Sequence, residues 1–167
     1  MDKVSIEKIQ NTKIFSLAEL IKIISLEKNN KEIIVFTNGC FDIVHPGHIH
    51  TLVEAKALGT KLIVAVNSDA SVKRLKGEKR PIQNENERAL ILASFSFVDY
   101  VVLFEEDTPL NLIENLKPNI LVKGGDYKIN EIVGADIVIE NGGKVEMIPF
   151  LTGFSTTNTI EKILKKK

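Results

Sequence analysis

The chain has 167 residues, and its 22 Lys and Arg balance 22 Asp and Glu, so the formal net charge is zero. This length fits one compact domain, or one domain with a short appendage. The balanced charge argues against a nucleic-acid partner, because nucleic-acid-binding surfaces usually carry a basic excess. No apolar run is long enough to span a bilayer, and no signal-peptide pattern is present. We expect a cytoplasmic protein that binds small molecules and neither nucleic acid nor membrane.

Segments rich in β-branched residues alternate with amphipathic segments from about residue 33 onward, a pattern typical of βαβ units. Most of the β-branched runs are continuously apolar, which suits a parallel sheet covered by helices on both faces. Right-handed crossovers between such strands predict an α/β fold with a doubly wound open parallel sheet. The strands are predicted at Ile33–Thr37, Lys61–Asn67, Tyr100–Phe104, Ile120–Lys123, Asp136–Glu140 and Lys144–Ile148.

Capping sequences mark the starts of several helices. Three such starts are Ser16 with Glu19, Asn84 with Glu87, and Thr108 followed by Pro109 at the first helical position. Further helices are predicted from Pro46 or Gly47 to a stop near Gly59, and from Thr157 to about Lys166. Residues 1–32 contain a lone amphipathic helix and are predicted to form an N-terminal helical appendage to a main domain at residues 33–167.

The loop after the first strand is the strongest candidate for a site, because open parallel sheets bind ligands beyond the carboxyl ends of their strands. It reads Asn38-Gly39-Cys40-Phe41-Asp42-Ile43-Val44-His45-Pro46-Gly47-His48. His45 and His48 lie across a helix start, so both imidazoles can face one site beside free main-chain N–H groups. Such a place attracts phosphate, and imidazoles can donate hydrogen bonds to oxygens that gain charge during phosphoryl transfer.

Each part of this loop also occurs without any ligand. An isolated histidine is usually a surface residue, and Pro-Gly often precedes a helix; the whole string, directly after a strand, favours a phosphate site. A zinc site made of Cys40, His45 and His48 is a third possibility, but it lacks a convincing fourth ligand. The single cysteine cannot form an internal disulfide.

The loop after the second strand combines polar and basic groups. Asn67, Ser68 and Asp69 precede a basic stretch that runs from Lys73 to Arg80 and includes Lys76. Such a stretch could fold onto a triphosphate, or it could be a solvated hinge without a partner. Arg88, in the next helix, is a similar candidate for binding phosphate.

Two later loops carry further candidates. The loop Lys123-Gly124-Gly125-Asp126-Tyr127 offers backbone room for a flat ligand, a cation for phosphate, and a carboxylate for sugar hydroxyls or a metal. Gly-Gly-Asp is also common in turns. The run Ser155-Thr156-Thr157 opens the last helix; one hydroxyl suffices as a cap, and the others could hold a phosphate.

The string from Gly39 to His48 resembles the H-x-G-H signature of the nucleotidyltransferase superfamily, which includes cytidylyltransferases and pantetheine-phosphate adenylyltransferase. Within it, residues 33 to about 165 are most similar to the adenylyltransferase family of ADP-heptose synthesis. The resemblance implies a Rossmann-like nucleotidyltransferase fold. The other stretches that carry it are Val64–Ser71, Arg74–Glu78, Phe104–Pro109, Leu121–Lys128, Asn141–Gly143 and Ser155–Asn158.

The resemblance implies transfer of AMP from ATP to D-glycero-β-D-manno-heptose 1-phosphate, which gives ADP-heptose and pyrophosphate for lipopolysaccharide or other surface glycans. The sugar phosphate would attack the α-phosphorus in line. Mg²⁺ is expected with ATP, because it offsets the charge of the triphosphate. We also expect a homo-oligomer, with a dimer as the simplest form.

The resemblance also implies roles for single residues. The catalytic residues are expected to be His45, His48 and Lys76, and no residue is expected to hold a metal. Asn67 and Asp69 are expected to contact the sugar phosphate. One departure is Phe150, which stands where relatives of the cytidylyltransferase branch carry an arginine. The residues expected to bind nucleotide are Asn38, Gly39, Cys40, Phe41, Gly47, Arg88, Lys123, Gly124, Asp126, Ser155, Thr156 and Thr157.

Two other functions stay open on the sequence. A cytidylyltransferase acting on glycerol 3-phosphate or a related alcohol phosphate would differ in its base and its acceptor. A nucleotide-binding sensor would keep the pocket but transfer nothing. Pyrophosphate release with ATP or CTP separates these three functions.

Overall fold

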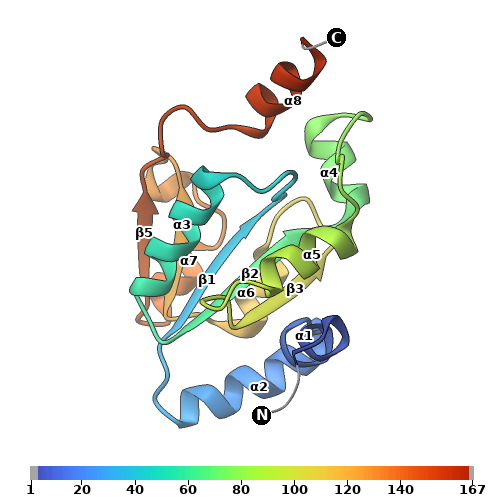
Figure 1. Cartoon of the computed structure of the whole chain (residues 1–167). Helices are drawn as coiled ribbons and strands as arrows, with labels where there is room; N and C mark the ends of the chain where they lie inside the picture. Colours follow the sequence, from blue (N-terminus) through green and yellow to red (C-terminus); the bar gives the residue numbers. More distant parts are fainter. Residues whose placement is uncertain (1–3, 166–167) are drawn as a thin grey trace.

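The computed structural model describes residues 4–165; residues 1–3 and 166–167 lie outside the described part. Five parallel strands form one sheet in the order β3-β2-β1-β4-β5, which confirms the predicted α/β architecture (Figure 1). The strand order reverses between β1 and β4, where open α/β sheets bind their ligands. The strands are β1 (Ile34–Gly39), β2 (Lys61–Asn67), β3 (Tyr100–Phe104), β4 (Ile120–Gly124) and β5 (Lys144–Ile148).

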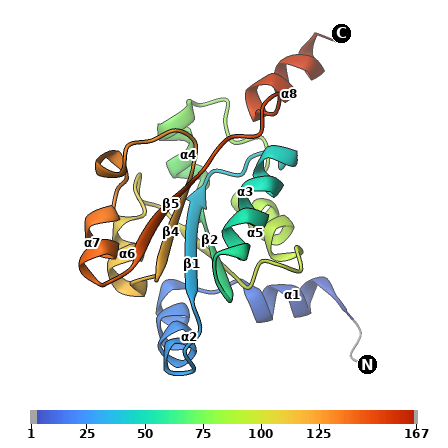
Figure 2. The same ribbon diagram turned by 90° about the vertical axis from the view of Figure 1, so that its left-hand side faces the viewer.

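Helices cover both faces of the sheet. Residues of α2, α6 and α7 pack with one set of strand side chains, and residues of α1, α3 and α5 pack with the opposite set (Figure 2). No helix in residues 4–165 combines the length and apolar character that crossing a membrane requires. The helices are α1 (Ile6–Lys13), α2 (Leu17–Asn29), α3 (Pro46–Ala57), α4 (Asp69–Lys76), α5 (Glu85–Ala93), α6 (Leu110–Leu116), α7 (Ala135–Glu140) and α8 (Thr156–Leu164), with a short 3₁₀ helix at Ile129–Glu131.

The N-terminal segment holds two helices, so the prediction of a lone helix is wrong. Between them the chain is extended, and Ile14 forms an isolated bridge with Val101 of β3. The capping box predicted at Ser16 is confirmed and starts α2. Leu20 and Ile24 of α2 are buried in the core. The domain boundary at residue 32 stays a prediction, with α2 packed against the sheet.

The second predicted capping box, at Asn84, is confirmed at the start of α5. The start predicted with Thr108 as cap and Pro109 as first helical residue is wrong by one residue, because Pro109 itself is the cap residue of α6 and helical geometry begins at Leu110. Proline fits there because a cap residue donates no intrahelical hydrogen bond. Gly59 follows the cap of α3 at Leu58, as expected.

The predicted strand at Asp136–Glu140 is wrong, because these residues form most of α7. A strand there, joined to β5 by the turn at Asn141-Gly142, would form an antiparallel hairpin. Strands β4 and β5 are parallel, so the segment between them must cross over the sheet, usually as a helix. Ala135 and Val138, three residues apart, bury one side of this short helix.

Replacement of Ile24 tests whether α2 is part of the cooperative fold. We expect Ile24→Ala to lower the free energy of unfolding by about 2–5 kcal/mol, because a fully packed side chain is removed from the core. Leu26→Ala is the matched control, since Leu26 lies on the same helix and is 65% exposed; its effect should stay within about 0.5 kcal/mol. Urea denaturation of both variants measures the difference. An unchanged main transition for Ile24→Ala would mean that α2 is an independent appendage.

Candidate functional site

The loop between β1 and α3 bends through two left-handed residues. Phe41 and Ile43 have φ values of +50° and +52°, which are uncommon outside glycine and rare for a β-branched side chain. The Phe41 ring is buried against Gly39, since a methyl group at Gly39 would lie 3.1 Å from Phe41 Cε2. Such a strained loop persists only when surrounding contacts hold it.

Asp42, between the two left-handed residues, provides these contacts. Its buried carboxylate accepts hydrogen bonds from Arg80 Nε at 2.5 Å, from Ile82 N–H at 2.9 Å and from Gln83 N–H at 3.0 Å. Burial by itself would raise the pKa of Asp42, but the two N–H groups and the guanidinium outweigh burial and hold this pKa below its usual value. The ionised carboxylate therefore ties the loop to residues 80–83.

His45 and His48 converge at the start of α3, as the sequence predicts. Their ring centroids are 3.8 Å apart with planes tilted by 18°, so the two imidazoles stack. Gly47 makes room for this arrangement, because a methyl group there would lie 3.0 Å from His45 Cε1. Both Nδ1 atoms are buried and have no hydrogen-bond partner among the described residues. Buried polar atoms are rarely left unpaired, so the pair indicates a place where a ligand binds.

The electrostatic state of this histidine pair follows from its burial. Burial lowers the pKa of His45. Burial also lowers the pKa of His48, to about 4, with a smaller contribution from the neighbouring His45. Both rings are therefore neutral at pH 7. Each neutral ring has one nitrogen that donates and one that accepts, and an arriving anion would favour protonation.

Residues from β1 and β4 meet beside the histidine loop at the switch point of the sheet. Lys123 Nζ donates a hydrogen bond to Asn38 Oδ1 at 3.1 Å. Burial lowers the pKa of Lys123. Burial likewise raises the pKa of the Cys40 thiol, and the nearby charge of Lys76 acts in the opposite direction. Lys76 itself ends α4 and is exposed. The structure thus brings these four predicted site residues to one end of the sheet.

Arg88 lies beneath the site with no exposed surface. Its Nη1 donates to the carbonyl oxygens of Cys40 and Asn67 at 2.6 and 2.7 Å, and its Nε donates to the Gln83 carbonyl at 3.0 Å. Nη2 donates to Asp69 Oδ1 at 2.7 Å. Four of the five guanidinium N–H groups are thereby used. The structure makes Arg88 a positioning residue that joins three loops, and its predicted contact with nucleotide stays a prediction.

The two residues expected to contact the sugar phosphate are engaged within the protein. Asn67 is 3% exposed and donates to Ser71 Oγ at 3.0 Å. The Asp69 side chain is 34% exposed and accepts from Arg88. Both therefore support the loop after β2. A contact with substrate stays a prediction for each.

The hydroxyl-bearing residues at the start of α8 have different roles. Ser155 caps the helix by accepting from Asn158 N–H at 3.0 Å, so α8 begins one residue earlier than predicted. Thr156 Oγ1 donates to the Asp42 carbonyl oxygen at 2.7 Å, which joins α8 to the histidine loop. Thr157 is exposed, as is Asp126 in the loop after β4. The nucleotide contacts expected of these residues stay predictions.

The sequence analysis gave no role of its own to Asp42, placed Arg80 only in the basic stretch that could fold onto a triphosphate, and did not identify Gln83. Gln83 also accepts from Ile43 N–H at 3.1 Å, so it holds the second left-handed residue directly. The available signal was Asp42, a carboxylate inside an otherwise apolar part of the motif. Its partners come from about forty residues further on, and nothing in their local sequence indicates that pairing.

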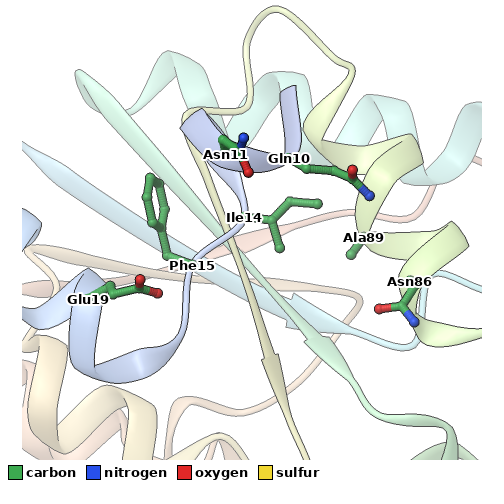
Figure 3. A pocket seen from close by; sticks show the side chains of 7 residues that line it. All are labelled: Gln10, Asn11, Ile14, Phe15, Glu19, Asn86 and Ala89. Atoms are coloured by element: carbon green, nitrogen blue, oxygen red, sulfur yellow. The ribbon is translucent and has the colours of Figure 1, made fainter. Parts of the chain in front are cut away.

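No metal centre accompanies the histidine pair in the described part of the chain. Within residues 4–165, no group of three or more His, Cys, Asp or Glu side chains is placed to hold a metal ion, and this includes the trio of Cys40, His45 and His48. A shallow cleft lies elsewhere, between the junction of α1 and α2 and the helix α5 (Figure 3). It contains none of the predicted site residues; its lining is Gln10, Asn11, Ile14, Phe15, Glu19, Asn86 and Ala89.

Comparison with known proteins gives consistent matches. Residues 36–162 match the family described as cytidylyltransferase-like. The Bifunctional protein HldE of Campylobacter jejuni subsp. jejuni serotype O:2 is 62% identical over 93% of this chain and 32% of its own length. The Bifunctional protein HldE of Geobacter sulfurreducens is 54% identical with the same coverage. The chain thus spans about a third of the length of these relatives.

A solved structure matches as well. The lipopolysaccharide core biosynthesis protein from Thermoplasma volcanium GSS1 is 34% identical, with a TM-score of 0.59. The match covers 72% of this chain and 97% of that one. The sheet and the histidine loop both lie within the residues that the cytidylyltransferase-like family matches, apart from the start of β1.

The histidine pair predicts an unusual titration. We expect the His48 imidazole of the ligand-free protein to titrate near pH 4. NMR measures the titration, and the loss of a signal in His48→Asn assigns it to His48. Because this folded-state pKa lies below the ordinary value of about 6.5, the neutral ring stabilises the fold; that stability is complete above about pH 6.5 and is lost as the pH falls toward 4. Inorganic tripolyphosphate should move the midpoint upward. A midpoint near 6.5 without ligand, or no response to tripolyphosphate, would contradict this expectation.

Proposed function

The chain belongs to the cytidylyltransferase-like family, and from that premise we propose that it is a nucleotidyltransferase that transfers AMP from ATP to D-glycero-β-D-manno-heptose 1-phosphate. The products are ADP-heptose and pyrophosphate. The observation that carries this proposal is the stacked histidine pair, with two buried unpaired nitrogens at a helix start beyond the carboxyl ends of the strands. Identities of 54–62% to proteins named HldE support the same reaction in this chain.

The chemistry is a direct in-line displacement. An oxygen of the sugar phosphate attacks the α-phosphorus of ATP, the bond from that phosphorus to the bridging oxygen breaks, and pyrophosphate leaves with the electron pair. The attacking phosphate monoester is already anionic near neutral pH, so no general base is needed. The work of the protein is to align the two phosphates and to stabilise the charge that spreads over their oxygens.

The start of α3 supplies the stabilising groups. The helix N-terminus favours negative charge. His45 and His48 would donate hydrogen bonds to phosphate oxygens, and the Nδ1 atom of neither ring is hydrogen-bonded to another described residue. The exposed ammonium of Lys76, at the end of α4, would close over the leaving pyrophosphate as a mobile charge.

The other predicted contacts belong to the proposal as well. The nucleotide would run along the end of β1 and the loops after β4 and β5. Asn67 and Asp69 would contact the sugar phosphate. The residues proposed along the nucleotide are Asn38, Gly39, Cys40, Phe41, Gly47, Arg88, Lys123, Gly124, Asp126, Ser155, Thr156 and Thr157.

Mg²⁺ would enter this site with ATP. The described residues offer no cluster of carboxylates or histidines that fits a metal ion. The ion would therefore be held chiefly by phosphate oxygens and water, as Mg²⁺ commonly is beside nucleotides. When bound, it would reduce the charge of the triphosphate, and the roles of the residues do not depend on a metal ligand from the protein.

The assembly and the location are also proposed. A homodimer is supported by α8, whose side chains are all at least partly exposed and include Ile163 and Leu164, exposed by 61% and 64%. Burying such an apolar helix face against a second copy would be favourable. A cytoplasmic location fits the use of ATP.

A pyrophosphate-release assay tests the proposed function directly. The four nucleoside triphosphates are each combined with D-glycero-β-D-manno-heptose 1-phosphate and with glycerol 3-phosphate. We expect release with ATP and the heptose phosphate. Release only with CTP and glycerol 3-phosphate would identify a cytidylyltransferase, and binding of ATP without release under any condition would identify a sensor.

His48→Ala tests the catalytic role of the histidine pair. We expect kcat to fall about 100- to 1000-fold, because one preorganised donor to the transition state is lost. Val53→Ala is the matched control, since Val53 lies on the same helix, is 43% exposed and belongs to none of the proposed contacts; its kcat should equal that of the parent. Turnover at the parental rate in His48→Ala, with intact folding, would refute the assignment.

A further inference from the structure

Two exposed aromatic rings meet at one glycine in the loop after β4. A methyl group placed on Gly125 would lie 2.7 Å from Cε2 of Phe150 and 3.1 Å from Cε2 of Tyr127. Gly125 has a φ of +114°, so both its backbone conformation and its surroundings require glycine. The two rings therefore approach the same stretch of bare main chain from different elements.

Both rings are more exposed than their size predicts. Phe150 is 67% exposed and Tyr127 is 43% exposed. Contact with the main chain of Gly124 and Gly125 leaves most of the Phe150 ring free. Exposed aromatic rings at a glycine-lined surface offer what a flat heteroaromatic ring needs, namely a π-face for stacking and main chain that a ligand can approach closely.

Phe150 lies beside α3, the helix that begins with the histidine pair, and lines a cleft with His50 of that helix. A methyl group on Gly124 would lie 3.3 Å from Phe150 Cε1 and 3.5 Å from Thr51 Oγ1. Thr51 Oγ1 in turn donates to the Gly47 carbonyl oxygen at 3.1 Å, in the first turn of α3. Lys123 precedes these glycines and is bonded to Asn38 at the end of β1. Gly124 thus lies between the Phe150 ring and Thr51 of α3, and Thr51 is one turn along the helix from Gly47.

We propose that Phe150 stacks on the base of the nucleotide, with Tyr127 as a second contact beside Gly125, and that this stacking gives the protein its preference for a purine. The proposal rests on the proposed function, which supplies the nucleotide. A purine has two fused rings and covers more of a phenyl face than a pyrimidine does. Stacking on a phenyl ring adds affinity without hydrogen bonds to the base. The preference for a purine over a pyrimidine therefore comes from the larger stacked area.

Isothermal titration of the full chain with ATP, CTP and inorganic tripolyphosphate tests this proposal. Phe150→Ala should raise the Kd for ATP by roughly 5- to 150-fold, the range for loss of one stacked base. The Kd for CTP should rise less, and the Kd for tripolyphosphate should not change, because the phosphate groups are untouched. Phe150→Trp should retain ATP binding. Ile139→Ala, at an exposed aliphatic residue of α7, is the control and should match the parent.

Several outcomes would overturn the proposal. Parental affinity of Phe150→Ala for ATP would do so, as would an equal loss for ATP and tripolyphosphate, which indicates general damage to the site. A variant that keeps its ATP affinity but changes its mass in light scattering would show that Phe150 packs against a second copy. Failure of the parent protein to bind ATP would refute the proposed function as well. If the parent turns over ATP and Phe150→Ala binds ATP with the same Kd, only the stacking is refuted.

Discussion

The buried carboxylate of Asp42 is the interaction on which the site depends. The chain on either side of it is left-handed at Phe41 and Ile43, a conformation that is unfavourable without external support. Asp42 supplies that support by accepting from Arg80 and the main chain after it, while its own carbonyl oxygen accepts from Thr156. Two segments that are distant in the sequence, residues 80–83 and the start of α8 at Thr156, thereby fix the loop that places the histidines at the start of α3.

The cations around this loop differ in their roles because arginine and lysine differ in chemistry. The planar guanidinium of Arg88 is buried and satisfied by three carbonyl oxygens and one carboxylate, so it serves as a rigid joint under the loops. Lys76 is a flexible point charge at a helix end. The site therefore combines the fixed guanidinium of Arg88 with the flexible ammonium of Lys76. This combination suits a reaction in which a polyanion must bind, be aligned and leave.

Much of the fold could be predicted from local sequence because its signals are local. Capping boxes at Ser16 and Asn84 and the apolar strand runs need no distant partner to be recognised. The segment Asp136–Glu140 could not be assigned in this way, because its β-branched residues suit a strand and only the parallel pairing of β4 with β5 demands a crossover. The burial of Arg88 was equally hidden, since its acceptors lie in three separate loops. The pattern of the histidine loop indicated the site, but the residues that hold it in shape depend on tertiary contacts.

Two neutral imidazoles and a helix start converge on the place where one triphosphate is proposed to bind. A crystal structure with α,β-methylene-ATP tests this most directly. We expect a ring nitrogen of both His45 and His48 within about 3.2 Å of phosphate oxygens, with the triphosphate at the N-terminus of α3. A triphosphate bound elsewhere, such as in the cleft beside Gln10 and Asn86, with the histidine rings free of phosphate, would contradict it.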